Sequence, residues 1–198
     1  MAKLYFNYST MNAGKSTQLL QAAHNYASRD MTPYLLTAAI DDRGGSARIS
    51  SRIGIAQPAA TYTPETDLAR QVAAQHEHEP IDCVFVDEAQ FLTKRQVWQL
   101  CALVDDLGIP VICYGLRTDF RGELFPGSAA LLALADLIRE VVAVCHCGSK
   151  ATMVARRDAD GNVVTSGAQI AIGGEESYVP LCRHHWRTAL VAAGAELG

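Results

Sequence analysis

The sequence has no long apolar run. None of its 198 residues belongs to a stretch that approaches the ~20 apolar residues of a membrane-spanning helix. The segment from Met1 to Tyr8 is too short, and too polar at its end, for a signal peptide. We therefore expect a cytoplasmic protein with no membrane partner.

The sequence also has no basic stretch. Its 17 Lys and Arg residues are scattered along the chain and are outnumbered by 21 Asp and Glu residues, which gives a net charge of −4. Proteins that follow a phosphate backbone usually carry a basic patch or stripe. The charge pattern therefore predicts no nucleic-acid partner.

Apolar segments are short and alternate between two kinds of spacing. Short, nearly all-apolar runs at 4–8, 34–39, 81–87, 111–115 and 138–144 predict buried strands. Helical spacing at 16–28, 64–78, 94–107 and 128–135 predicts helices, of which the second begins with Thr63 as a cap and Pro64 in its first turn. Polar stretches at 41–52 and 119–127 are expected to be loops. This alternation is typical of an α/β fold around a parallel sheet.

The alternation of strand and helix stops near Cys145. Residues 153–157 and 163–165 are expected to form a hairpin, with Asp160 and Gly161 in its turn. We therefore predict two domains, an α/β core over 1–144 and a small second unit over 145–198.

A phosphate-binding P-loop is predicted after the first strand. The eight residues of the loop follow an apolar run and open a helix: Ser9, Thr10, Met11, Asn12, Ala13, Gly14, Lys15 and Ser16. Backbone N–H groups there can surround a phosphate, Lys15 can neutralise its charge, and the Ser16 hydroxyl can bind Mg²⁺. Gly14 leaves room for the backbone to approach the phosphate.

An acidic pair follows the apolar run at 81–86. Asp87 is suited to binding Mg²⁺ directly or through water, and Glu88 is suited to acting as a general base beside the terminal phosphate of ATP. The alternative is a solvated acidic strand end, and the geometry decides between the two.

Two clusters of Cys and His flank the predicted hairpin. Cys145, Cys147, Cys182 and His185 are expected to form a closed tetrahedral zinc site that stabilises the small unit. His146 or His184 could replace one ligand, and unrelated free thiols are the alternative. The remaining cysteines, Cys83, Cys101 and Cys113, lie on apolar runs and are interpreted as core residues.

The order of these motifs resembles type II thymidine kinases in their bacterial form. The resemblance spans nearly the whole chain. It is carried by the P-loop, Asp87-Glu88-Ala89-Gln90-Phe91, the segment from Tyr114 to Phe120, the two Cys clusters, and Ile172-Gly173-Gly174 with Tyr178. Three departures from the family pattern are Ser9 in place of Gly, one residue between Cys145 and Cys147 in place of two, and His185 in place of Cys.

The resemblance implies a fold and an activity. The fold would be a P-loop core related to RecA-type ATPases, followed by a zinc-binding subdomain whose loop, about 165–182, closes over the nucleoside. The activity would be transfer of the γ-phosphoryl group of ATP to the 5′-hydroxyl of deoxythymidine, giving dTMP and ADP. Mg²⁺ with ATP, a structural Zn²⁺, a homotetramer and feedback inhibition by dTTP are implied in the same way.

The resemblance also implies roles for individual residues. Glu88 matches the family's proton acceptor, and Lys15 and Ser16 match its phosphate and Mg²⁺ contacts. The other nucleotide-side positions are Asp87, Gln90, Asp41 and Arg43. The positions around the base and sugar are Met11, Phe91, Leu116, Phe120, Phe125 and Tyr178. Aromatic rings in otherwise polar loops are suited to stacking on a pyrimidine, and local loop packing is the alternative for each of them.

Three other functions are compatible with parts of the sequence. A nucleic-acid-dependent ATPase would explain Asp87-Glu88-Ala89-Gln90, but the negative charge and the single core disfavour it. A nucleotide-binding regulatory module would need Lys15 but not Glu88. A GTPase is disfavoured because the sequence has no Asn-Lys-x-Asp segment for reading the base.

Overall fold

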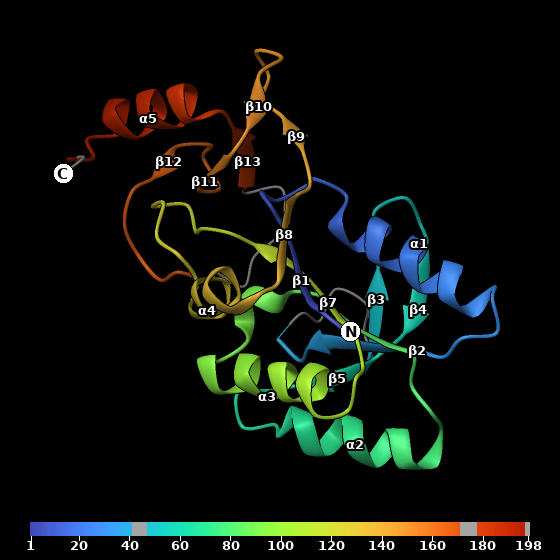
Figure 1. Cartoon of the computed structure of the whole chain (residues 1–198). Helices are drawn as coiled ribbons and strands as arrows, with labels where there is room; N and C mark the ends of the chain where they lie inside the picture. Colours follow the sequence, from blue (N-terminus) through green and yellow to red (C-terminus); the bar gives the residue numbers. More distant parts are fainter. Residues whose placement is uncertain (41–46, 171–177, 197–198) are drawn as a thin grey trace.

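A six-stranded sheet forms the centre of the molecule in the computed structural model, which describes residues 1–40, 47–170 and 178–196 (Figure 1). Every pairing in this sheet is parallel, and the strand order is β5-β2-β6-β7-β1-β8. The strands are β1 (Leu4–Ser9), β2 (Pro33–Ala38), β5 (Ala60–Tyr62), β6 (Cys83–Val86), β7 (Val111–Leu116) and β8 (Leu137–Glu140). The predicted α/β fold with a parallel sheet is confirmed.

Helices cover both faces of the sheet. α1 (Lys15–Ala27) packs on one face, and α2 (Leu68–His78), α3 (Lys94–Asp105) and α4 (Pro126–Leu134) pack on the other. Alternation along β6 explains the two cores, because Cys83 and Phe85 face α1 whereas Val84 and Val86 face the opposite core. Among the described residues, we find no helix with the length and apolar character that crossing a membrane requires.

Helix α2 begins later than the sequence predicts. Residues 63–66 form a turn instead, in which the Thr63 N–H donates to Thr66 Oγ1 at 2.9 Å. The helix starts at Leu68, and the side chain of Asp67 caps it by accepting a hydrogen bond from the Arg70 N–H at 3.0 Å. The prediction of Thr63 as the cap was wrong because Asp67 supplies a second, better placed capping oxygen.

The predicted loop at 41–52 is in part a hairpin. β3 (Arg48–Ser50) pairs antiparallel with β4 (Ala56–Pro58). Ile49 is buried between exposed neighbours, which is the alternation of a strand, but three residues are too few to reveal it in the sequence. The predicted nucleotide contacts Asp41 and Arg43 lie outside the described residues.

The C-terminal part of the chain forms two small antiparallel sheets. β9 (Ala143–Val144) pairs with β10 (Lys150–Ala151), and β12 (Val163–Val164), β11 (Met153–Arg157) and β13 (Tyr178–Leu181) form the other sheet, followed by α5 (Arg183–Ala192). The predicted hairpin is therefore confirmed. The predicted strand at 138–144 is instead two strands in different sheets, because the chain leaves β1 after the Val141 N–H donates to Tyr8 O.

Candidate active site and metal centre

The P-loop, the acidic pair and the end of β7 meet at one edge of the central sheet. They follow β1, β6 and β7, and the carboxyl ends of parallel strands are where α/β folds bind ligands. A cavity of about 370 Å³ opens at this edge. It is lined by Met11, Asn12, Ala13, Gly14, Lys15, Ser16, Thr17, Arg48, Ser50, Ser51, Arg52, Ile53, Glu88 and Leu116.

The P-loop has the geometry of an anion cradle. Gly14 has φ +81° and sits at the start of α1, where nothing lies within 4 Å of the position that a Cβ would occupy. The left-handed backbone is what favours glycine here. No side chain caps α1, and a helix N-terminus of this kind is suited to binding an anion. Lys15 Nζ donates to Thr10 O at 2.8 Å, which holds the ammonium group within the loop.

Ser9 and Thr10 lie behind the cradle. Both are buried, and Ser9 Oγ donates a hydrogen bond to the carbonyl of Val141. They support the loop and do not line the cavity, whereas the six residues from Met11 to Ser16 do.

Asp87 is almost completely buried at the end of β6. Burial, together with the charge of Glu88, raises the pKa of Asp87 to about 7, although a hydrogen bond from Ser16 opposes the shift. Its Oδ1 atom is buried and has no hydrogen-bond partner among the described residues. A buried carboxylate oxygen of this kind, beside a Ser hydroxyl, is suited to a cation.

Glu88 turns the chain away from the strand. Its φ of +52° is in the left-handed region, and the short helix η1 (Ala89–Phe91) follows directly. The Tyr62 hydroxyl donates to the Glu88 carbonyl at 3.0 Å and so supports the turn. Because of this turn, the side chain of Glu88 lines the cavity while Asp87 remains buried behind it.

Gln90 connects Glu88 to β7. Its Nε2 donates to Glu88 Oε2, and its Oε1 accepts a hydrogen bond from the Leu116 N–H at 2.9 Å. Gln90 itself is 1% exposed, and both bonds are partly buried. The structure thus places this predicted nucleotide-side residue against the candidate base, outside the lining of the P-loop cavity.

The predicted base and sugar positions fall into two groups. Met11 and Leu116 line the cavity, whereas Phe91, Phe120, Phe125 and Tyr178 do not. The Phe91 and Phe125 rings pack edge to face with centroids 6.1 Å apart. Phe120 and Phe125 are 1% and 4% exposed, and Tyr178 is half-buried at the start of β13.

The hairpin of β3 and β4 contributes residues that sequence reasoning missed. Arg48, Ser50, Ser51, Arg52 and Ile53 line the cavity opposite the P-loop. Two arginines in this position are suited to the charge of a triphosphate. The sequence does show two Arg residues, four positions apart, in a polar segment. Only the hairpin of the folded chain brings that segment to the P-loop.

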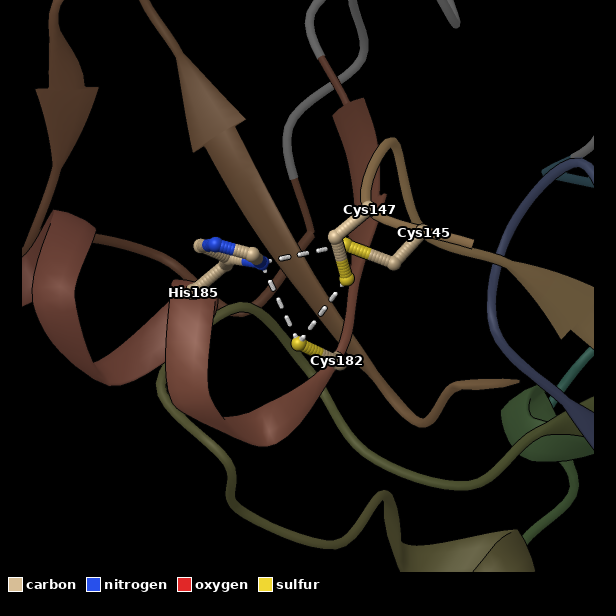
Figure 2. A group of neighbouring side chains, drawn as sticks. All are labelled: Cys145, Cys147, Cys182 and His185. Carbon is tan, nitrogen blue, oxygen red and sulfur yellow. Dashed lines mark hydrogen bonds between the residues drawn. The ribbon is translucent and has the colours of Figure 1, made fainter. Parts of the chain in front are cut away.

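Figure 2 shows three cysteines and one histidine brought together from the two ends of the small unit. The ligand atoms of Cys145, Cys147, Cys182 and His185 all lie within 4.8 Å of one another. The Cys147 and Cys182 sulfurs are 3.9 Å apart, and His185 Nδ1 is 3.5 Å from Cys145 Sγ and 3.3 Å from Cys182 Sγ. Tetrahedral zinc with ordinary bond lengths requires about 3.8 Å between sulfurs and about 3.6 Å from sulfur to nitrogen.

His185 is the histidine that joins the three cysteines. The rings of His146 and His185 are tilted against each other with centroids 4.3 Å apart, and His184 packs beside His185. Hydrogen bonds from Ser149 lower the pKa of Cys147 to about 6, which favours the thiolate that a metal binds. The donor set and the spacing of the cluster fit a zinc ion. All six cysteines are free of disulfide bonds, and Cys83 and Cys113 are buried in the core as predicted.

Comparison with known proteins shows similarity along nearly the whole chain. A sequence model of the family described as "Thymidine kinase" matches residues 2–186. The thymidine kinase of Ruegeria pomeroyi is 62% identical over 196 residues, which is 99% of each chain. That of Jannaschia sp. is 64% identical over 190 residues, 96% of this chain and 97% of the relative. That of Agrobacterium fabrum is 60% identical over 186 residues, 94% of this chain and 96% of the relative.

Proposed function

The chain belongs to the thymidine kinase family and is an ATP-dependent nucleoside kinase, and we propose that Glu88 accepts the proton of the thymidine 5′-hydroxyl during phosphoryl transfer. The observation that carries this proposal is that the P-loop and the Glu88 side chain line the same cavity. The γ-phosphoryl group would move from ATP to the 5′-oxygen, leaving dTMP and ADP.

The P-loop side of the cavity would hold the triphosphate. The N–H groups at the start of α1 would donate to phosphate oxygens, and Lys15 would place its charge beside them. Arg48 and Arg52 would add charge from the opposite wall. Asp41 and Arg43 are proposed to act on the same side.

Ser16 and Asp87 would hold Mg²⁺. The buried, unpartnered Asp87 Oδ1 and the neighbouring Ser16 hydroxyl fit a hard cation that prefers oxygen ligands. When bound with ATP, Mg²⁺ neutralises charge that develops on the phosphate oxygens.

The nucleoside would bind beyond Glu88, next to Leu116. Leu116 and Met11 border the cavity, and the Phe91 and Phe125 pair lies on η1 and at the start of α4. We propose that these rings, with Phe120 and Tyr178, form the base and sugar pocket. The segment at 165–182, of which 171–177 lie outside the described residues, is proposed to cover it. Gln90 would link this pocket to the proposed general base, because it bonds to both Leu116 and Glu88.

Residues 145–198 are proposed as a separate unit for which zinc has a structural role. Its core contains the metal-ligand residues Cys145 and Cys182 among few apolar side chains, so the metal would supply much of its stability. Because four protein side chains complete the tetrahedron, no position remains for a substrate.

Three further properties are proposed from the family resemblance. The enzyme would be a homotetramer. It would be located in the cytoplasm, a reducing compartment that suits six free cysteines. It would be inhibited by dTTP. Light scattering tests the tetramer, and activity assays with added dTTP test the inhibition.

ADP release distinguishes the proposed reaction from its alternative, a nucleic-acid-dependent ATPase. The assay compares thymidine, 5′-deoxythymidine that lacks the acceptor hydroxyl, single-stranded DNA, and no addition. We expect release with thymidine alone, at one ADP per dTMP. Equal release with 5′-deoxythymidine would contradict transfer to the 5′-oxygen, and stimulation by DNA alone would favour the ATPase.

A further inference from the structure

A tryptophan of the zinc unit reaches the loop that carries Phe120. Trp186 lies in the first turn of α5, directly after the metal-ligand residue His185. Its Nε1 donates a hydrogen bond to Phe120 O at 3.0 Å, across 66 positions of the sequence. The bond joins the small unit to the segment at 119–127, which follows β7.

The indole ring also fits closely against that segment. Gly122 has φ +86°, and a Cβ there would lie 3.2 Å from Trp186 Cη2 and 3.4 Å from Met153 Cε. The left-handed backbone and the short distance to the ring both select glycine. The segment therefore passes over the tryptophan at van der Waals distance.

The segment is rigid on its other side. Asp119 Oδ1 accepts hydrogen bonds from the Arg121 and Glu123 N–H groups, each at 2.9 Å. The guanidinium of Arg156 in β11 lies 4.6 Å from the centroid of the Phe120 ring. Phe120 is thus held by Asp119 from within the segment and by Trp186 and Arg156 from the small unit.

Trp186 is equally tied to the metal cluster. Its backbone N–H donates to Cys182 O at 3.0 Å, and its side chain packs in the same apolar cluster as Cys145 and Cys182. The position of the indole is therefore fixed by the zinc unit, and the position of Phe120 O depends on the indole.

We propose that Trp186 is a positioning residue for the pyrimidine nucleoside, which acts by holding Phe120 and its segment in the binding conformation. The inference rests on the proposed place of Phe120 in the nucleoside pocket. Trp186 itself does not contact the substrate. The zinc unit thus determines nucleoside affinity as well as its own stability.

Trp186→Phe tests the hydrogen bond while keeping an aromatic ring at the position. Loss of the N–H leaves the carbonyl of a buried residue without its donor, so we expect the KM for thymidine to rise roughly tenfold. The KM for ATP should change less than about twofold, and the bound zinc should stay at the wild-type level. Trp98→Phe is the matched control, because Trp98 lies on α3 and is 55% exposed.

An unchanged KM for thymidine, or an equal rise in both KM values, would overturn the inference. The spectroscopic test uses the Trp98→Phe protein, in which Trp186 is the only indole. Its fluorescence should change on saturation with thymidine alone, and an unchanged spectrum counts against the proposal. This measurement keeps native Trp186 and so remains decisive if Trp186→Phe fails to fold.

Phe120→Ala distinguishes a failure of this inference from a failure of the proposed nucleoside pocket. If Phe120→Ala leaves the KM for thymidine unchanged, the pocket assignment and the inference both fail. If it raises the KM but Trp186→Phe does not, only the inference fails. In the double variant, the effect of Trp186→Phe should largely disappear, because the tryptophan acts through Phe120.

Discussion

Adjacent carboxylates have different surroundings at the end of β6. Asp87 is 2% exposed and lies behind the cavity, whereas Glu88 adopts a left-handed backbone and lines it. In a continuing strand, the two side chains would point to opposite faces of the sheet. The turn at Glu88 therefore gives the two carboxylates separate positions, as the proposed cation site at Asp87 and the proposed general base at Glu88 require.

Glu88→Gln tests the general base. The amide keeps the size and can still accept the hydrogen bond from Gln90, but it cannot take the proton of the 5′-hydroxyl. We expect kcat to fall by roughly 10² to 10⁴, with KM values for ATP and thymidine nearly unchanged. Glu79→Gln, at an exposed position after α2, is the control. A near wild-type kcat with chemistry rate-limiting would leave Glu88 with a positioning role only.

Gln90→Met tests whether the amide acts through Glu88. The change removes the bonds to Glu88 Oε2 and to the Leu116 N–H while keeping most of the volume. We expect kcat to fall roughly tenfold, as for the loss of one hydrogen bond. In the Glu88→Gln background, the same change should cost less than about twofold. Equal losses in both backgrounds would show that Gln90 acts independently of the base.

At the scale of elements, capping decides where α2 begins. The Asp67 side chain accepts from the Arg70 N–H at 3.0 Å and from Gln99 Nε2 at 3.1 Å, which ties α2 to α3. Thr63 lies in the preceding turn. The position of this helix matters because α2 and α3 cover the face of the sheet opposite α1.

Asp67→Ala and Thr63→Ala form a matched pair for this interpretation. Loss of the Asp67 cap should lower the free energy of unfolding by about 1 kcal/mol. Thr63→Ala should change it by less than about 0.5 kcal/mol, as is usual for exposed positions. Urea unfolding at constant pH measures both values. A larger loss for Thr63→Ala than for Asp67→Ala would restore Thr63 as the start of the helix.

At the scale of the whole molecule, one chain holds two kinds of cysteine. Burial raises the pKa of Cys83 to about 12 and that of Cys113 further, whereas Ser149 lowers the pKa of Cys147 to about 6. The first two are neutral core residues at neutral pH. The third belongs to the cluster with Cys145, Cys182 and His185, which lies at the start of α5.

Removal of the metal should therefore expose only the cluster to thiol reagents. We expect one zinc per chain, and after chelation at pH 7 we expect Cys145, Cys147 and Cys182 to react while Cys83 and Cys113 stay unmodified. The melting temperature should fall, because zinc binding contributes to the stability of the small unit. Mass spectrometry of the labelled peptides measures the pattern. Absence of stoichiometric zinc, or early reaction of Cys83, would contradict it.

Long apolar runs and spaced motifs were predictable from the sequence, and short elements were not. β1, β6 and β7 are continuous apolar runs because helices cover both of their faces. β5 and β3 have three residues each, which is too short for a periodic signal. β9 was joined to the end of β8 in the prediction because Ile138 and the residues from Val141 to Val144 are apolar, although the two strands pair with different partners.

The sequence by itself determined the chemistry of the sites, because that chemistry resides in residue types at fixed local spacing. Gly14-Lys15-Ser16 before a helix, Asp87-Glu88 after a strand, and the Cys and His pairs each specify a ligand class. Only the tertiary structure decided which of these groups meet. The place of Arg48 and Arg52 in the P-loop cavity, the bond from the Leu116 N–H to Gln90, and the bond from Trp186 to Phe120 each join segments that are distant in the sequence. Such contacts depend on how strands and loops pack in space, and local sequence carries no record of that packing.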